Sequence, residues 1–332
     1  MKVWLPTVRA GTGADVFSER LLDALGRRGI PGSISWFGAH CEFWPQLARC
    51  NPPAGTTVIH ANAMSAFAFA GLGYPVVATD HGTFCNPRFI ASKPFVQRLY
   101  QRLVVDRYIR KSFDACIATT AVSAHLADAI RQQEGIDVRT IPNWIDTTRF
   151  TPAPRPRGGG FRLLYAGSSS FRKGFDVVRD LAARLGDGVT LYCQRSLAAR
   201  LGPHARVRIE CFDKLPADAM PALYATVDAV LMPSRYEGFG YVALEAMACA
   251  RPVIGFTTLA EVCGPDAAAL VSVGDAEAMS AAVARLAADP ALCARMGNAG
   301  RQRAVDHYTE SKAIDAYASL YEEVASAAAS VQ

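Results

Sequence analysis

The sequence has no long apolar run and no pattern of paired cysteines. None of its stretches approaches the roughly 18–20 consecutive apolar residues of a membrane-spanning helix. Its first residues, MKVWLPTVRAGTG, lack the apolar core of a signal peptide. The nine cysteines are scattered and include no C-x-x-C motif, as is typical of reduced thiols in a cytosolic protein. We therefore expect a cytoplasmic protein with no zinc or iron–sulfur centre.

Charged residues are few and unevenly placed. Only 20% of the 332 residues are charged and 51% are hydrophobic, which excludes a disordered or coiled-coil chain. Residues 1–150 hold 16 basic and 11 acidic side chains, whereas residues 151–332 hold 19 of each. The basic surplus lies in residues 93–111, with six basic side chains and one acid, Asp106. We therefore expect the first half to meet an anionic partner or surface.

Short apolar runs alternate with amphipathic stretches along the whole chain. This alternation predicts βαβ units with parallel sheets. Strands are expected over 2–5, 33–37, 57–61, 75–79, 114–119, 138–141, 161–167, 189–193, 207–211, 228–234, 252–256 and 269–273. Helices are expected over 14–28, 64–72, 94–111, 121–133, 173–186, 215–226, 241–250, 276–288, 291–305 and 311–329.

The segment TPAPRPRGGG, residues 151–160, interrupts this alternation. Its prolines cannot donate to a strand ladder and its glycines lose much entropy on ordering, so it indicates a linker. We expect one domain over 1–150, a second over 161–310, and a helix over 311–332 that crosses back onto the first. The expected fold class is α/β, with two doubly wound domains and a ligand site in the cleft between them.

The motif richest in chemistry is PSRYEGFGYVALEAMACARPVIG, residues 233–255. After a strand, a loop and the start of a helix carry Glu237, Gly238, Phe239, Gly240 and Tyr241. Glycines allow a ligand to approach the backbone closely, and a helix start binds an anion such as a diphosphate. Glu237 and Glu245 would repel a phosphate, so we expect them to face the hydroxyl groups of a nucleotide sugar.

The E-x7-E spacing of Glu237 and Glu245, with EGFG, LEAMA and RPVIG around it, resembles the retaining glycosyltransferases of family 4. The resemblance implies the GT-B fold, in which two Rossmann-like domains face a central cleft. It also implies that Glu237 contacts the donor sugar and Glu245 its ribose. The loop and helix start between them, Gly238 to Tyr241, would then bind the donor.

A second segment, YAGSSSFRKGFDVV at 165–178, resembles the strand–loop–helix of the same family that ends in Lys-Gly. The resemblance implies that Lys173 holds the departing diphosphate. Ser168 stands where the family usually has an arginine, so we expect Ser168 to contact the donor and Arg172 to supply the missing charge. Cations at a helix start oppose the helix dipole unless an anion binds there, which supports this interpretation.

Two shorter segments in the first half of the chain also resemble the family. IPNWIDTTRF, 141–150, resembles the family's segment leading out of its first domain, which implies either a donor contact for Asn143 or a plain loop. VVATDHGT, 76–83, implies a place for His81 near the reacting carbon, whereas a second strand-end histidine, His60, is more often structural.

Two further donor contacts are expected. The glycine turn at 9–17 implies that Gly13 lies near the donor diphosphate or sugar. An NAD site is not expected there, because no acidic residue follows at the required spacing. Base contacts in folds of this kind come largely from backbone atoms, here near Phe212.

The basic stretch KPFVQRLYQRLVVDRYIRK, 93–111, is expected to form one helix. Two interpretations stand beside each other. Its cations are either solvated, or they attract an anionic membrane surface or a phosphate-bearing acceptor. Nucleic acid is not an expected partner, because no aromatic stacking platform accompanies the basic residues.

The resemblance implies a hexosyltransferase. It would move a sugar from a nucleoside diphosphate sugar to a hydroxyl of a glycan or glycolipid acceptor, with retention at the anomeric carbon. The expected catalytic residues are Glu237, Lys173, Arg172 and His81. No cofactor or metal is expected, because no D-x-D motif occurs. The alternatives are a nucleotide-sugar epimerase or phosphorylase of the same fold, or a non-catalytic basic membrane-binding module. A peripheral place at the inner membrane face fits either role.

Overall fold

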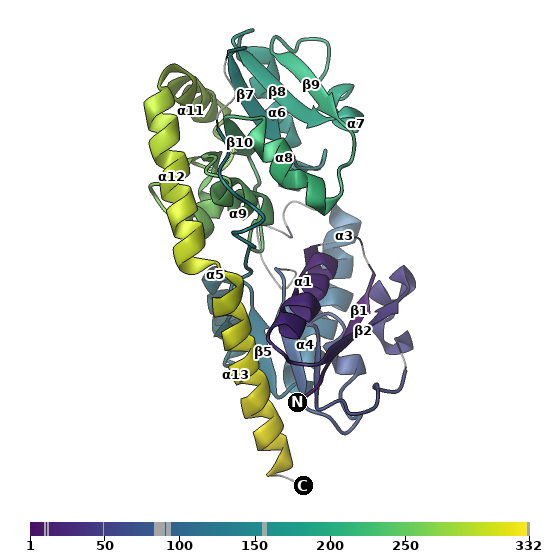
Figure 1. Cartoon of the computed structure of the whole chain (residues 1–332). Coiled ribbons are helices and arrows are strands. Elements are labelled where there is room, and N and C mark those ends of the chain that lie inside the picture. Colours follow the sequence, from purple (N-terminus) through teal and green to yellow (C-terminus); the bar gives the residue numbers. More distant parts are fainter. Residues whose placement is uncertain are drawn as a thin grey trace. The chain divides into compact units, whose positions relative to one another are not determined.

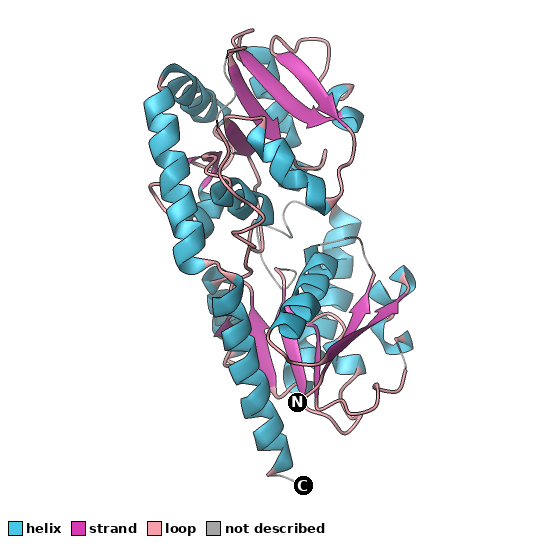
Figure 2. Cartoon of the chain, viewed as in Figure 1, coloured by secondary structure: helices cyan, strands magenta, loops and turns pink. Residues whose placement is uncertain are grey.

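Two parallel sheets of six strands each organise the described part of the chain. Figure 2 distinguishes their strands from the helices around them. The computed structural model describes residues 1–9, 11, 13–48, 50–82, 90, 94–154 and 158–330. The chain divides into unit 1, Met1–Asn143 with Glu310–Gln332, and unit 2, Trp144–Thr309 (Figure 1). Each unit holds one sheet with helices, so the prediction of two doubly wound α/β domains is confirmed.

The sheet of unit 1 has the order β2-β1-β3-β4-β5-β6. Its strands are β1 (Val3–Val8), β2 (Gly32–Phe37), β3 (Val58–Asn62), β4 (Val76–Asp80), β5 (Ala118–Ala121) and β6 (Arg139–Thr140). Its helices are α1 (Gly13–Arg27), α3 (Phe95–Tyr100), α4 (Asp106–Ala115), α5 (Ala124–Glu134) and α13 (Glu310–Ala329), and its shorter turns are η1 (Ala39–Glu42), η2 (Pro45–Leu47), η3 (Ala66–Ala68) and the π-helical η4 (Gln101–Val105). The strand order reverses between β1 and β3.

The sheet of unit 2 has the order β12-β11-β10-β7-β8-β9. Its strands are β7 (Phe161–Tyr165), β8 (Val189–Gln194), β9 (Arg208–Phe212), β10 (Ala229–Met232), β11 (Val253–Phe256) and β12 (Ala268–Val271). Its helices are α6 (Phe175–Arg184), α7 (Arg195–Ala198), α8 (Met220–Ala225), α9 (Tyr241–Ala248), α10 (Ala260–Cys263), α11 (Ala276–Ala288) and α12 (Pro290–His307), and its 3₁₀ turns are η5 (Phe171–Lys173), η6 (Ala217–Ala219) and η7 (Thr257–Leu259). Here the strand order reverses between β7 and β10.

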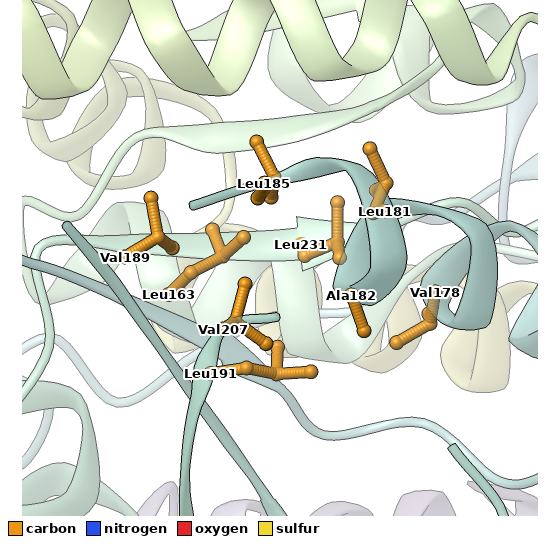
Figure 3. Close-up of a pocket in the computed structure, with 9 residues that line it drawn as sticks. All are labelled: Leu163, Val178, Leu181, Ala182, Leu185, Val189, Leu191, Val207 and Leu231. Atoms are coloured by element: carbon orange, nitrogen blue, oxygen red, sulfur yellow. The ribbon is translucent and has the colours of Figure 1, made fainter. Parts of the chain in front are cut away.

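The core of unit 2 packs the sheet against its helices. Strands β10 and β11 are buried along their whole length, as expected for central strands of a parallel sheet covered on both faces. Figure 3 shows nine side chains from this layer, Leu163, Val178, Leu181, Ala182, Leu185, Val189, Leu191, Val207 and Leu231. All nine are aliphatic, so the space that they line belongs to the hydrophobic core and offers no polar group to a ligand.

The expected helix over 64–72 is wrong. Only the 3₁₀ turn η3 forms there. The amide of Met64 donates to Asn62 Oδ1 over 2.9 Å, and the amide of Phe67 donates to Ser112 Oγ over 2.9 Å. Amides in the first turn of a helix have no intrahelical partner, so these two bonds do not themselves oppose a helix. Gly71 and Gly73 have positive φ values of 84° and 83°, and this backbone conformation prevents the turn from continuing as an α-helix.

The expected helix over 94–111 is interrupted rather than uniform. It consists of α3, the π-helical turn η4 and α4 in direct succession. Residues five apart stack in a π turn, and here Gln101 Nε2 donates to Asp106 Oδ1 over 2.9 Å. Lys93, at the start of the basic stretch, lies outside the described residues.

The boundary between the units differs from the expected one at residue 150. Unit 2 begins at Trp144, and the expected linker falls inside it. Arg301 donates to the carbonyls of Thr147 (2.9 Å) and Phe150 (2.7 Å), and buried Arg251 donates to that of Ala153 (3.0 Å). These bonds attach the segment to unit 2. Residues 155–157 lie outside the described part.

Helix α13 belongs to unit 1, where it contacts α1 and β3 (Figure 1). Three ion pairs of the described residues hold its exposed side, Arg27 with Glu310 at 2.6 Å, Arg28 with Asp315 at 2.7 Å and Arg139 with Glu323 at 2.5 Å. Its inner side supplies buried aromatic residues to the core. Among the described helices, none is long and apolar enough to cross a membrane.

Candidate functional site

The most promising site lies at the switch point of the unit 2 sheet. Strands β7 and β10 are neighbours there, and the chain leaves them in opposite directions. In open α/β sheets, ligands bind outside the carboxyl ends of the strands at such a point. The loop 166–174 follows β7, and the loop 233–240 follows β10. These are the two loops that the sequence motifs single out.

Arg235 fastens the two loops together. Its backbone amide donates to the carbonyl of Arg172 over 2.8 Å. Its guanidinium makes two bonds to Asp176, of 2.7 and 2.6 Å, and lies 3.8 Å from the centre of the Phe171 ring. A bidentate, stacked arginine holds a fixed geometry, so each loop limits the motion of the other.

Gly174 makes the close approach of the loops possible. It has φ +69°, and a Cβ atom there would lie 1.9 Å from the carbonyl oxygen of Pro233. Only glycine fits, because a side chain would have both a backbone collision and an unfavourable φ. The Lys-Gly pair therefore brings Lys173 to the β10 loop.

Three charged side chains meet where these loops join. Lys173 Nζ donates to Glu237 Oε1 over 2.5 Å, and Arg172 Nη1 lies 3.7 Å from Glu237 Oε2. Arg172 also donates to the carbonyl of Tyr236 over 3.2 Å. Glu237 is buried, whereas both cations are partly exposed. The group thus has one buried carboxylate and two cations that solvent reaches, a net positive charge suited to an anion.

Arg172 and Lys173 precede α6 rather than beginning it, which corrects the expected helix start at 173. They lie in the 3₁₀ turn η5, followed by Gly174 as the N-cap. Ser170 closes this turn by accepting from the amide of Lys173 at 3.3 Å. The short turn orients both cations toward Glu237 instead of along the helix axis.

Tyr165, at the end of β7, shapes the serine-rich loop. Its hydroxyl donates to the carbonyl of Ser168 over 2.6 Å and lies 3.2 Å from the carbonyl of Lys173. Burial, followed by the charges of Glu237 and Asp176, raises the pKa of Tyr165, so it remains a donor. Ser168 is exposed and its Oγ lies 3.1 Å from that of Ser170.

The β10 loop leads directly into α9. Gly240 is its N-cap, with φ 105°, and no side chain caps the first turn. A helix start carries a partial positive charge, which favours an anion there. Phe239 is buried in edge-on contact with the rings of Tyr241 (5.9 Å) and Tyr308 (5.5 Å), and Gly238 is half-buried beside it.

Glu245 lies on the inner side of α9. It is buried, and the fully buried hydroxyl of Tyr224 donates to its Oε2 over 2.9 Å. Arg251 donates to the backbone carbonyl of the same tyrosine over 2.9 Å. Tyr224 is therefore bonded both at its hydroxyl and at its backbone carbonyl, and its hydroxyl orients the carboxylate of Glu245. Phe212 ends β9, two strands from β7, and is half-buried.

The remaining expected residues belong to unit 1. His81 follows β4 and packs edge-on against Phe17 at 4.7 Å, and burial lowers its pKa to about 4. Gly13 begins α1 and is exposed. Asn143 ends unit 1 and is buried, and its Oδ1 has no hydrogen-bond partner in the described structure. Their expected roles toward a donor stay predictions.

His60 has a structural environment. Its Nδ1 lies 2.6 Å from the hydroxyl of Tyr321, and its Nε2 lies 2.6 Å from Thr79 Oγ1. Both ring nitrogens are thus used, and one of the partners comes from α13. Burial, followed by the charge of His81, lowers the pKa of His60 to about 3, so the ring is neutral at neutral pH.

Sequence patterns did not identify Tyr224, Tyr165 or Arg235. Arg235 stands inside the quoted motif, two residues before Glu237, so its proximity was a usable signal. The hydroxyl of Tyr165 bonds to carbonyls of the loop that follows it, and that of Tyr224 bonds to a residue of the next helix, so no sequence motif marks either contact. The described residues include no group of three or more His, Cys, Asp or Glu side chains that could hold a metal.

Two family models match the chain in succession. The one described as Glycosyltransferase Family 4 matches residues 9–149, and the one described as Glycosyl transferases group 1 matches residues 160–289. Together the two matches cover most of the chain, and they divide it near the boundary between the units.

Curated relatives are glycosyltransferases. The chain is 29% identical over 281 residues to the MMP alpha-(1->4)-mannosyltransferase of Mycolicibacterium hassiacum, which covers 76% of this chain and 66% of that protein. It is 31% identical over 236 residues to the GDP-mannose-dependent alpha-(1-6)-phosphatidylinositol monomannoside mannosyltransferase of Mycolicibacterium smegmatis, over 61% of this chain and 57% of that protein. The matched regions thus span less than two thirds of the length of either relative.

Solved structures share the fold over nearly the whole chain. Sucrose-phosphate synthase from Thermosynechococcus elongatus has a TM-score of 0.76 at 18% identity and covers 98% of this chain and 100% of its own. Anabaena Alr3699/HepE in complex with UDP-glucose has a TM-score of 0.72 at 17% identity, over 97% and 100%. The strand orders, the two successive family matches and these neighbours agree, and the chain belongs to the family 4 glycosyltransferases with the GT-B fold.

Proposed function

We propose that this protein transfers a sugar from a nucleoside diphosphate sugar to a hydroxyl group of a glycan or glycolipid acceptor, with retention at the anomeric carbon. The observation that carries the proposal is the group of Lys173, Arg172 and Glu237 at the switch point of unit 2. It combines two cations for a diphosphate with one carboxylate for sugar hydroxyls.

The donor class has further support. A neighbour of the same fold was solved with UDP-glucose, and a relative is named as GDP-mannose-dependent. The proposed acceptor class rests on relatives named for phosphatidylinositol monomannoside and for the lipopolysaccharide core. The base and the sugar are left open.

The chemistry proposed for these residues is mainly electrostatic. The bond between the anomeric carbon and the diphosphate oxygen breaks, and the acceptor oxygen forms a bond to the same carbon. The departing phosphate oxygen takes the proton of the acceptor. Lys173 and Arg172, together with the start of α9, stabilise the negative charge that develops on the diphosphate. No carboxylate needs to attack the sugar.

Donor binding requires a change of partner at Glu237. In the structure its carboxylate neutralises Lys173 at 2.5 Å. A diphosphate would draw Lys173 to its own oxygens, and Glu237 would then accept from sugar hydroxyls. Glu245, held by Tyr224, accepts from the ribose. A sugar without a diphosphate would not draw Lys173 away from Glu237. We therefore expect binding to depend on both the diphosphate and the sugar of the donor.

Thermal unfolding with UDP, GDP, ADP and their sugars tests the donor class. A ligand at 100 times its dissociation constant adds about 2.7 kcal/mol of stability, so the true donor raises the melting temperature. Glu237→Gln should keep most of this shift and lose turnover. The control is Glu277→Gln, an exposed acid on α11.

Product analysis by NMR separates the alternatives. Release of the nucleoside diphosphate with an α-linked product from an α-linked donor supports retaining transfer. Conversion of the donor sugar into its epimer without an acceptor would identify an epimerase instead. Absence of stabilisation by every nucleotide in the panel would overturn the proposal.

A further inference from the structure

Helix α3 carries large apolar side chains on its surface. None of its six residues is buried, although it contains Phe95, Val96 and Leu99. With Leu103 of η4, these side chains fall within one arc of about 100° around the helix axis. The helix thus has an apolar face with nothing packed on it among the described residues.

Two aromatic residues from another part of unit 1 extend this face. The ring of Phe43 lies 6.0 Å from that of Tyr100, the last residue of α3, and 6.0 Å from that of Trp44. We call Phe43, Trp44, Phe95, Val96, Leu99 and Leu103 the α3 surface. Their exposed fractions lie between 49% and 75%. An apolar group of this size rimmed by charge marks an interaction site.

The charge beside the α3 surface is of one sign. Arg98 and Arg102 flank the apolar arc, both are exposed, and neither has an acidic partner within the described chain. The one acid of the stretch, Asp106, is buried and accepts from Gln101, because the π turn stacks these two residues. The fold therefore removes the negative charge from this face and leaves the positive charges outside.

We propose that the α3 surface docks onto a membrane with anionic lipid headgroups. Its aromatic and aliphatic side chains enter the boundary between headgroups and acyl chains, where Trp and Phe are favoured. Arg98 and Arg102 extend their aliphatic stems along the same boundary and reach lipid phosphates with their charged ends. A bilayer adapts to an apolar face of any shape, whereas a protein partner with an acidic rim would need a surface complementary to this one. The α3 surface is therefore better suited to a bilayer.

Sedimentation with vesicles tests the proposal on the full chain. Vesicles of phosphatidylcholine alone are compared with vesicles of phosphatidylcholine and phosphatidylglycerol in equal parts, at low and high salt. Wild-type protein should bind the anionic vesicles more tightly, and salt should weaken the difference without abolishing the apolar contribution. Free inorganic phosphate, added as a competitor, should not displace the protein if the bilayer itself is recognised.

Three double variants separate charge from apolar contact. Arg98→Gln with Arg102→Gln should lower the affinity for anionic vesicles by about fivefold per arginine. Phe95→Ser with Leu99→Ser should lower it at least about tenfold and remove the residual binding at high salt. Arg285→Gln with Arg295→Gln changes the net charge equally, at exposed positions of unit 2, and should bind as wild type does.

The outcomes are distinct. Loss of binding in the first two variants with an unchanged third supports the proposal. Equal binding of all four proteins, or absence of binding to anionic vesicles, overturns it. A concentration-dependent dimer in sedimentation velocity that only Phe95→Ser with Leu99→Ser dissolves would assign the surface to a second copy instead. Circular dichroism of each variant shows that folding is retained.

Discussion

The hydroxyl of Tyr224 on α8 donates a hydrogen bond of 2.9 Å to the carboxylate of Glu245 on α9. Both side chains are buried. The phenol is neutral, so its hydrogen bond orients Glu245 without adding a charge of its own. In the proposed function, this carboxylate accepts from the ribose of the donor.

Tyr224→Phe should therefore weaken nucleotide binding. The ring packing is kept and one hydrogen bond is lost, worth about 0.5–1.5 kcal/mol, or a few-fold to roughly tenfold in the dissociation constant. Isothermal titration with the preferred nucleoside diphosphate measures it. Tyr192→Phe, on half-buried Tyr192 of β8, is the control. An unchanged dissociation constant in Tyr224→Phe would show that Glu245 needs no such support.

Arg172→Ala should lower the rate of transfer by at least the tenfold that about 1.4 kcal/mol represents, and more than it weakens donor binding. Arg172 Nη1 lies 3.7 Å from Glu237 Oε2, and in the proposed mechanism it stabilises charge that grows only as the diphosphate departs. Ser168→Arg in the same protein should restore part of the rate. Normal turnover in Arg172→Ala would show that, of the two cations in this loop, only Lys173 contributes to the rate.

Gly174→Ala should separate the two loops of the site. Its Cβ would collide with Pro233, and its φ of +69° is unfavourable for alanine, so we expect a lower melting temperature and weak nucleotide binding. Gly186→Ala is the matched control, because a Cβ there meets nothing within 4 Å. Equal stability of the two variants would contradict the close contact of the loops.

Acid should destabilise unit 1 before it affects the carboxylates. The pKa of His60 is lowered to about 3 from 6.5, and that of His81 to about 4. Between pH 6.5 and these values the unfolded chain binds more protons, so stability falls as the pH falls. Lowering the pH from 7 to 5 costs about 2 kcal/mol from His60 alone.

Tryptophan fluorescence during urea unfolding measures this effect, because three of the four tryptophans lie in unit 1. His60→Gln should flatten the dependence on pH, although it lowers stability at pH 7. His204→Gln changes an exposed histidine of unit 2 and should leave the dependence as it is. A flat profile in the wild type would refute a neutral, buried His60.

Activity should persist in EDTA. The cations Lys173 and Arg172 and the start of α9 provide the counter-charge in the proposed mechanism, so no metal is required. Release of the nucleoside diphosphate is measured with and without the chelator, and with added magnesium or manganese. Complete loss of activity in EDTA that either metal restores would show that a metal takes part.

The sequence predicted the strands better than the helices. Strands such as β10 and β11 are buried on both faces, so each appears in the sequence as a continuous apolar run. The 64–72 segment has a helical pattern of apolar residues, but only a 3₁₀ turn forms in it, and Gly71 and Gly73 have positive φ values of 84° and 83°. Periodicity does not record the backbone conformation that the fold gives to these glycines.

The site shows the same division between local and distant information. Local motifs that resemble the family singled out Glu237 and Glu245 in residues 233–255, and Lys173 in residues 165–178. The bonds of Tyr224 to Glu245 and of Arg235 to Asp176 join residues 21 and 59 positions apart. The bond of Arg235 to Asp176 exists because β7 and β10 lie side by side in the sheet, and the bond of Tyr224 to Glu245 exists because α8 and α9, which precede and follow β10, pack together.

The membership of α13 in unit 1 has a consequence for the order in which the chain is made. Unit 2 is translated as one continuous stretch and can bury its core once Thr309 has left the ribosome. Unit 1 by then has its sheet but lacks Tyr321, the partner of His60, and the rest of the α13 face. Unit 1, whose synthesis begins first, can therefore complete its core only after the whole of unit 2 has been made.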